Sequence, residues 1–318
     1  MILVCGGLAD PVTELVCARL DACGHPYRLL DLGTYPAGFR IHWRWHGARP
    51  SGCIAGPDWK VDLDELTGVY VRYLGNEGRV RPDGVADESI PALHAEYDAG
   101  VTALLEQLPC LVVNRLAGGM SNHSKPYQAL VLQQCGLRTP PTLVTNDPAA
   151  VCAFQATHGE VIYKSLSGVR SIVRRFGPDH VARLPLLRHG PAQFQAFIPG
   201  DNVRVHTVGD RLFPTRVRST AVDYRYARRD GADVDMAPAE LPPAVAESCL
   251  RVARALDLPL AGIDLKVTPD DEWYCFEVNP SPGFLYYERH TGQPISLALA
   301  DLLHEGAPAT RHVPAFVQ

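Results

Sequence analysis

The segment formed by residues 261–284, AGIDLKVTPDDEWYCFEVNPSPGF, constrains the fold more than any other part of this 318-residue chain. Apolar and polar residues alternate on both sides of a polar turn at 269–272, which predicts the two strands of a hairpin. A pleated strand sends successive side chains to opposite faces. One face of the first strand would then be apolar, and the other would carry Asp264 and Lys266.

The second strand of this hairpin is also predicted to have one face with polar, metal-ligating side chains. Its pleat would place Tyr274, Phe276 and Val278 on one face, and Cys275, Glu277 and Asn279 on the other. If the register sets Asp264 against Glu277, their Cβ atoms lie about 5 Å apart. Two carboxylates and an amide oxygen suit Mg²⁺ far better than zinc. The hairpin therefore predicts a magnesium-nucleotide site at Asp264, Glu277 and Asn279.

Length and composition are typical of an intracellular enzyme of two or three domains. The apolar residues, 46% of the chain, can form a substantial core, and a formal charge of -5 argues against nonspecific binding to nucleic acid. Nine cysteines without a CxxC pair fit neither a disulfide framework nor a zinc knuckle, which favours a reduced, cytoplasmic setting. No apolar run approaches about 18 residues and no basic leader opens the chain, so neither a membrane span nor secretion is expected.

The first 120 residues predict an α/β domain. Residues 2–5 have the pattern of a strand, and Asp10 can cap a helix whose first turn contains Pro11. A strand at 69–74, a long helix at 88–108 and a strand at 111–114 follow. Arg72 lies in the first of these strands, where an arginine needs an anionic partner. Substrate binding and a structural ion pair are equally supported.

Two lysines in the middle of the chain predict contacts to phosphate. Lys125 lies at the start of a helix, which is unfavourable for a cation unless an anion is near, although a lone exposed lysine is the commoner explanation. Lys164 ends a strand and precedes a small-residue loop that contains Ser167 and Gly168. Such a loop can form a flap whose backbone amides, together with Lys164, donate to phosphates.

The strand at 193–198 is broken by Pro199 and Gly200. A strand that ends in an apolar bend can present backbone amide and carbonyl groups to the edge of an adenine ring. The pattern therefore predicts a hinge that binds the nucleotide base.

Arginines alternate along the two strands that follow this hinge. Arg204 lies in the first of them, and Arg216 and Arg218 lie in the second. Together they suggest a field directed at phosphate or carboxylate. The charged run 223–235, which includes Arg225, is either a loop near this site or a solvated loop.

From about residue 125 to residue 303 the chain resembles an ATP-grasp ligase. The resemblance rests on the order and spacing of six elements, which are Lys125, Lys164, the hinge Gln195, Ala196, Phe197 and Ile198, and the metal-binding Asp264, Glu277 and Asn279. The phrases GLRTPPTLVTND, DYR and TGQPI are most similar to the branch of ribosomal-protein glutamate ligases and microviridin-type graspetide synthetases.

The resemblance implies an α/β chain with the α+β ATP-grasp fold, in which ATP lies between two subdomains. Residues 1–120 would form a pre-ATP-grasp α/β domain, and 121–192 the central subdomain with the phosphate flap. Residues 193–305 would form the C-terminal subdomain with the magnesium site, and 306–318 a tail.

The resemblance also implies roles for single residues. The residues expected to bind ATP are Lys125, Lys164, Ser167, Gly168, Gln195, Ala196, Phe197, Ile198 and, at the ribose, Asp201. Two Mg²⁺ ions would be held by Asp264, Glu277 and Asn279. Arg204 and Lys164 would be catalytic, with Arg204 steadying the transferred phosphate. The residues expected to contact the acyl substrate are Arg72, Arg218 and Arg225.

The implied activity is that of an ADP-forming carboxylate–amine ligase, which makes an amide or ester through an acyl phosphate. Its partners would be a carboxylate substrate, a small molecule or a peptide, and an amine or hydroxyl nucleophile. Two alternatives stay open: a graspetide-type macrocyclase of a ribosomal precursor peptide, and a phosphotransferase or catalytically silent nucleotide-binding protein. A homo-oligomer is compatible with the sequence, whereas nucleic acid and membrane partners are not expected.

Overall fold

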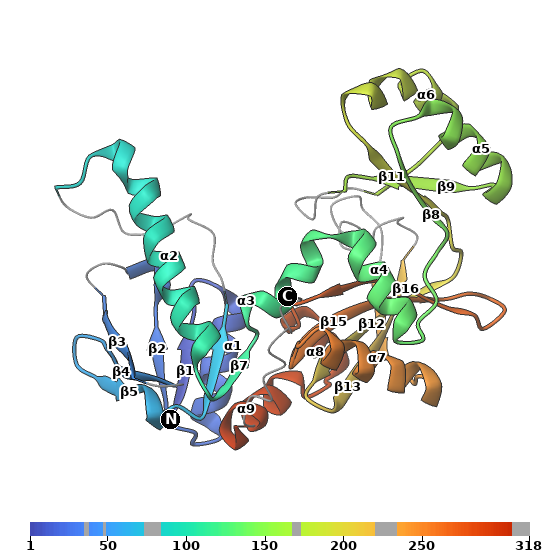
Figure 1. Ribbon diagram of the computed structural model, residues 1–318. Helices are drawn as coiled ribbons and strands as arrows, with labels where there is room; N and C mark the ends of the chain where they lie inside the picture. Colours follow the sequence, from blue (N-terminus) through green and yellow to red (C-terminus); the bar gives the residue numbers. More distant parts are fainter. Residues whose placement is uncertain (35–37, 47–48, 73–83, 167–172, 220–233, 307–318) are drawn as a thin grey trace.

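The computed structural model describes residues 1–34, 38–46, 49–72, 84–166, 173–219 and 234–306. Figure 1 shows an N-terminal unit drawn in blue and cyan, a small green and yellow unit, and a larger unit that runs from yellow to red. Four sheets organise these described residues, one of them parallel and three antiparallel.

The N-terminal unit is built on a parallel sheet in the order β2-β1-β6-β7. Its strands are β1 (Ile2–Cys5), β2 (Tyr27–Leu30), β6 (Gly68–Val71) and β7 (Leu111–Val113), and its helices are α1 (Pro11–Ala22) and α2 (Ile90–Gln107). Every residue of β1 and β6 is buried, as expected for parallel strands covered on both faces. Asp10 caps α1 by accepting a hydrogen bond from the Thr13 N–H at 2.9 Å. The elements predicted from the sequence in this region are confirmed to within a few residues.

A second sheet in the order β3-β4-β5 packs on one face of the parallel sheet. Its strands are β3 (Arg40–His46), β4 (Arg49–Ala55) and β5 (Lys60–Asp62). Short helical turns elsewhere in the described chain are η1 (Leu32–Thr34), η2 (Leu63–Glu65), η3 (Asp87–Ser89), α3 (Leu116–Gly119), η4 (Met120–His123), α6 (Pro178–Val181) and η5 (Leu184–His189).

The small middle unit is an antiparallel sheet in the order β10-β9-β11-β8. Its strands are β8 (Thr142–Thr145), β9 (Val161–Lys164), β10 (Arg174–Arg175) and β11 (Ala192–Ala196), and α5 (Pro148–His158) packs against it. Residue 193, the expected start of the C-terminal subdomain, lies inside β11, which pairs with β8 and β9. The subdomain boundaries stay a prediction.

The large sheet has the antiparallel order β14-β13-β12-β15-β16. Its strands are β12 (Asp201–Val208), β13 (Arg211–Ser219), β14 (Val234–Pro238), β15 (Leu260–Val267) and β16 (Trp273–Asn279). Helices α4 (Lys125–Gln134) and α7 (Pro243–Ala255) pack on one face, through Val203, Val205, Ile263 and Leu265. Helices α8 (Leu285–Thr291) and α9 (Ile295–Glu305) pack on the other.

One apolar core joins the N-terminal unit to the large sheet. It contains Val4 and Val16 from the first, Val208 and Leu260 from the second, and Leu299 of α9 between them. Figure 1 shows α9, in red, at this junction. The two units are therefore held together by apolar burial, which is the dominant favourable term in folding.

A buried glutamine docks α4 on the edge of the large sheet. Gln128 Nε2 donates to the Val278 carbonyl, and the Val278 N–H donates to Gln128 Oε1, both at 2.9 Å. The side-chain amide thus forms the two backbone hydrogen bonds that a further strand would form with the edge strand β16. Because Lys125 begins the same helix, this contact fixes where the α4 N-terminus lies relative to β16.

Replacement of Gln128 by Leu tests this docking contact. The variant leaves a buried N–H and a buried carbonyl of Val278 unpaired, so we expect a loss of about 3 kcal/mol in the free energy of unfolding. Urea denaturation measures it. Gln133→Leu, at an exposed position of the same helix, is the control, and equal stability of the two variants would contradict the account.

Candidate active site

Three neighbouring strands carry a row of charged side chains on one face of the large sheet. Asp264 of β15 lies directly opposite Glu277 of β16, and Gly262 lies opposite Asn279. On the other side of β15, Arg204 of β12 lies opposite Asp264. Residues that face each other in antiparallel strands point to the same side of the sheet. Arg204, Asp264 and Glu277 therefore form one row, with Asn279 beside it.

The oxygen atoms of this row suit a hard divalent cation. Two carboxylates and an amide oxygen form a donor set of the kind that Mg²⁺ prefers. Asn279 Oδ1 accepts a hydrogen bond from the Ser281 N–H at 2.9 Å, and an amide oxygen has a second lone pair for a cation. Among the described residues no group of three or more His, Cys, Asp or Glu is placed to hold a metal ion. The residues present fit magnesium rather than a zinc set.

A β-bulge in the hairpin corrects the predicted faces of β16. The register shifts in mid-strand, so that Leu265 pairs with Cys275 and Phe276 is the extra residue. Cys275 is 1% exposed and lies in the apolar core on the far face. The prediction that Cys275 shares a face with Glu277 is therefore wrong, as is the prediction that Tyr274 belongs to the apolar face. One extra residue reverses the alternation of faces.

Arg204 and Asp264 form a largely buried ion pair. Arg204 Nη1 donates to Asp264 Oδ1 at 2.6 Å, and the two side chains are 7% and 22% exposed. A charge-assisted hydrogen bond of this length fixes both groups. The Arg204 guanidinium also lies over Gly262, where a Cβ atom would come within 2.1 Å of Nη2. Gly262 thus leaves the space that the guanidinium occupies.

The two predicted phosphate-binding lysines approach each other from different units. Lys125 is the first residue of α4, and its Nζ donates to the Ser165 carbonyl at 3.1 Å. Lys164 ends β9, and it is buried. The structure therefore brings Lys125 to the strand end that carries Lys164. The predicted flap residues Ser167 and Gly168 lie outside the described residues.

The predicted hinge leaves the middle sheet at the end of β11. Gln195 and Ala196 are the last residues of that strand, and both are buried. The Phe197 N–H donates to the Glu160 carbonyl at 2.9 Å, which extends the pairing by one residue. Ile198 then leads out of the sheet toward β12.

Lys266 connects this hinge to the large sheet. Its Nζ donates to the Ile198 carbonyl at 2.9 Å and lies 5.0 Å from the centre of the Phe197 ring. The Arg175 guanidinium lies 4.2 Å from the same ring, so two cations stack on one aromatic side chain. Burial, with a smaller contribution from Arg175, lowers the pKa of Lys266. The sequence places Lys266 two residues after Asp264, but its contact with the hinge was not predicted.

Asp201 and two of the predicted arginines lie on the opposite face of the sheet. Asp201 Oδ2 accepts from Arg218 Nε at 3.2 Å, and Arg216 Nε lies 4.0 Å from the same oxygen. The register pairs Arg216 with Val203, on the apolar face that α7 covers. The prediction that Arg204 and these arginines form one field is wrong, because the pleat separates Arg204 from them.

Asn202 is a residue that the sequence reasoning missed. It lies two positions before Arg204 and pairs with Lys266 across β15, so it shares the face of the charged row. The alternation of the segment DNVRVH could have indicated it, because residues two apart in a strand share a face. Asn202 thus lies on the face of the charged row, whereas Asp201 lies on the other face, and the role of Asp201 at the ribose stays a prediction.

Arg72 forms the structural ion pair that was one of its two predicted roles. Its Nε donates to Asp10 Oδ2 at 3.1 Å, and its Nη1 donates to Ser281 Oγ at 3.0 Å. Ser281 in turn contacts Asn279, so Arg72 connects the N-terminal unit to the loop that follows β16. Of the other two predicted contacts to the acyl substrate, Arg218 lies on the opposite face of the sheet from Arg204, and Arg225 lies outside the described residues.

A buried histidine lies beside Arg204 on the same face of β12. His206 is 0% exposed, and its ring is 4.8 Å from that of Tyr287 in an edge-on arrangement. No described residue forms a hydrogen bond with either ring nitrogen. Burial, and to a smaller extent the charge of Arg204, holds the pKa of His206 well below its usual range. The imidazole is therefore neutral in the folded chain.

The chain is similar to known proteins over part or most of its length. Residues 192–303 match the model of the RimK-like ATP-grasp domain. A RiPP-associated ATP-grasp ligase from Chryseobacterium gregarium, in complex with ADP and a leader and core peptide, has a TM-score of 0.82 at 22% identity, over 95% of this chain and 96% of that one. The macrocyclase MdnC from Microcystis aeruginosa, bound with precursor peptide MdnA, has a TM-score of 0.78 at 24% identity, over 95% of this chain and 99% of that one.

A third structural neighbour and one curated relative extend the comparison. The ATP-grasp ligase PsnB, complexed with a minimal precursor, has a TM-score of 0.78 at 26% identity, over 95% of this chain and 97% of that one. The glutathione synthetase of Xanthomonas campestris is 33% identical over 156 residues, which is 48% of this chain and 44% of that protein. The match thus spans less than half of the length of this curated relative.

The chain has the ATP-grasp fold, as the resemblance predicted. Residues 192–303, which match the RimK-like ATP-grasp domain, contain the whole charged row and Asn279. No helix among the described residues is long and apolar enough to cross a membrane.

Replacement of Gly262 by Ala tests the packing of the charged row. The new methyl group would collide with the Arg204 guanidinium, so we expect a loss of about 2 kcal/mol in the free energy of unfolding, as for other overpacked sites. Denaturant titration measures it. Gly283→Ala, where a Cβ atom meets nothing within 4 Å, is the control. A fully stable Gly262→Ala protein would show that the guanidinium does not lie over this glycine.

The pH dependence of stability tests the burial of His206. The folded pKa lies below the unfolded value of about 6.5, so the unfolded chain binds the extra proton first as the pH falls. This contribution to stability is complete above about pH 6.5 and is lost below it, by up to about 1.4 kcal/mol per pH unit. We expect His206→Gln to have a flatter stability profile between pH 6.5 and 4.5 than the wild type. Identical slopes, with His189→Gln as an exposed control, would contradict the prediction.

Proposed function

We propose that this chain is an ADP-forming, ATP-dependent ligase that activates a carboxylate as an acyl phosphate and joins it to an amine or a hydroxyl. The observation that carries this proposal is the row of Arg204, Asp264 and Glu277 on three adjacent strands, with Asn279 beside it. Phosphoryl transfer needs little covalent help from a protein, so positioning and charge neutralisation supply most of the rate. The row combines the groups that such neutralisation requires.

Activation is needed because a carboxylate is a poor acyl donor, whose leaving group would be oxide. Asp264, Glu277 and Asn279 would hold two Mg²⁺ ions, which when bound neutralise charge on the β- and γ-phosphates. Arg204 is held against Asp264 at 2.6 Å and would stabilise the charge that develops on the transferred phosphoryl group. The nucleophile then attacks the acyl phosphate, and inorganic phosphate leaves.

The residues around the row would bind the rest of the nucleotide and exclude water. Lys125 and Lys164 would donate to its phosphates, and the hinge at 195–198 would hold the adenine, with Lys266 bound to the Ile198 carbonyl. The loop that contains Ser167 and Gly168 would shield the acyl phosphate, because water would otherwise hydrolyse it.

A peptide is the substrate class that the comparisons favour. PsnB, which has 26% identity over 95% of this chain, is complexed with a precursor. Glutathione synthetase, named for a small peptide product, is related over 156 residues. A graspetide-type macrocyclase, which links side chains within one precursor, is the second candidate, and the peptide-bound macrocyclase MdnC supports it. A reducing, cytoplasmic setting is also proposed, since all nine cysteines are free thiols.

Replacement of Glu277 by Ala tests the proposed metal ligand. The residue lies on the ligand face of β16 rather than in the core, so the variant should fold and lose turnover with Mg-ATP by at least about 100-fold, or ~3 kcal/mol in the barrier. Steady-state ADP release measures the rate, and circular dichroism confirms the fold. Glu247→Ala, on the exposed surface of α7, is the control. A folded Glu277→Ala protein with wild-type turnover would exclude the metal assignment.

Trapping of the intermediate tests the reaction class. Hydroxylamine should intercept an acyl phosphate as a hydroxamate, in amounts that equal the ADP and phosphate released, and only with ATP, Mg²⁺ and the correct carboxylate. The panel should contain free amino acids, dipeptides and acidic peptides. A stable phosphorylated product would favour the phosphotransferase alternative. Release of AMP and pyrophosphate would contradict the acyl-phosphate mechanism.

A further inference from the structure

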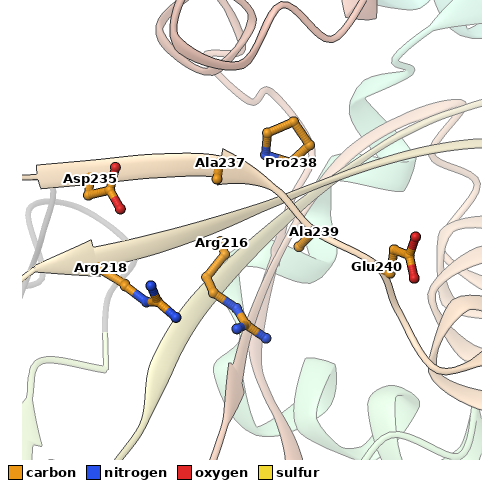
Figure 2. A pocket seen from close by; sticks show the side chains of 7 residues that line it. All are labelled: Arg216, Arg218, Asp235, Ala237, Pro238, Ala239 and Glu240. Carbon is orange, nitrogen blue, oxygen red and sulfur yellow. The ribbon is translucent and has the colours of Figure 1, made fainter.

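A pocket of about 360 Å³ lies on the face of the large sheet opposite the charged row. It is formed by β13, β14 and the two residues that follow β14, Ala239 and Glu240, as Figure 2 shows. Arg216 pairs with Ala237 and Arg218 pairs with Asp235, so these four residues share one face. That face is the one of Val203, on the other side of the sheet from Arg204. The pocket and the charged row therefore lie on opposite faces of the sheet.

Arg216 supplies an unused donor to this pocket. Its Nε is buried, and no described residue accepts a hydrogen bond from it. The carboxylate of Asp201 lies 4.0 Å away and is engaged at 3.2 Å by Arg218. A buried N–H of a cation without an acceptor is costly. A ligand oxygen that reached Arg216 Nε would remove this cost.

Two carboxylates of the pocket complement the arginines. Figure 2 shows the guanidinium groups of Arg216 and Arg218 pointing the same way from β13, with Asp235 and Glu240 to either side. No described residue forms an ion pair with Asp235 or Glu240. The pocket thus presents both signs of charge, and a ligand that carries both an anionic and a cationic group matches it best.

We propose that this pocket binds a peptide segment in which an acidic and a basic side chain lie close together. The acidic side chain binds Arg216, where a guanidinium fits a carboxylate, and the basic one binds Asp235 or Glu240. A volume of about 360 Å³ is small for a ligand pocket and suits two side chains better than a nucleotide. The inference rests on the proposed peptide substrate. A second contact on the far face of the sheet would raise the affinity of a peptide whose reacting carboxylate lies at the charged row.

The test observes the Arg216 Nε–H directly by NMR in the full-length chain labelled with ¹⁵N-arginine. The probe is the peptide acetyl-Gly-Glu-Gly-Lys-Gly-amide, and the resonance is assigned by its loss in Arg216→Lys. We expect a saturable shift of this resonance, no shift of the Arg211 Nε–H from the same strand, and at least roughly fivefold weaker binding when Gln replaces the Glu or norleucine replaces the Lys. The absence of a saturable shift, or equal affinities for the three peptides, would overturn the proposal.

The same samples separate this inference from the proposed function. ADP and hydroxamate formed with a peptide carboxylate, but without any response of Arg216, would refute the pocket alone. A response of Arg216 in a chain that forms no ADP with any carboxylate would refute the ligase alone. The measurement uses the wild-type chain, so a poorly folded variant does not weaken it. Arg211→Gln, on the surface of β13, confirms the assignment of the neighbouring resonance.

Discussion

The register of strands β12, β15 and β16 is the constraint on which the rest of the site depends. It sets Arg204, Asp264 and Glu277 side by side across three strands. A slip of one residue in either pair would turn a carboxylate toward the core. Helices α4 and α7 cover the far face over apolar side chains. Such a slip would therefore bury a carboxylate among apolar groups that cannot pair with it. The apolar core therefore enforces the arrangement of the polar row.

Two buried amides attach the surrounding elements to these strands. Gln128 of α4 pairs with both backbone groups of Val278, near the end of β16. Asn114, after β7, does the same at the start of β15, where its Oδ1 accepts from the Leu260 N–H at 3.1 Å and its Nδ2 donates to the Leu260 carbonyl at 2.6 Å. The N-terminal unit and the lysine-bearing helix are thus both fixed on the strands that carry the proposed metal ligands.

Much of the fold and of the charged row could be predicted from the sequence, because the alternation of residues 261–284 indicates which side chains share a face. The predicted faces of Tyr274 and Cys275 were wrong, because the strand contains a bulge. An extra residue such as Phe276 cannot be recognised from composition. The prediction that Arg216 and Arg218 share the face of Arg204 failed for a related reason. Alternation within one strand says nothing about which face it shares with the next strand. The contacts of Lys266 with the hinge and of Arg72 with Ser281 join segments far apart in the chain, so no local pattern indicates them.

A crystal structure of the wild-type chain with Mg²⁺ and ADP tests the central claim most directly. The account predicts a metal ion within about 2.0–2.1 Å of oxygen atoms of Asp264, Glu277 and Asn279, the distance that Mg²⁺ requires. It also predicts that Arg204 keeps its contact with Asp264 while the nucleotide is bound. An ordered nucleotide whose metal touches none of these three residues would contradict it.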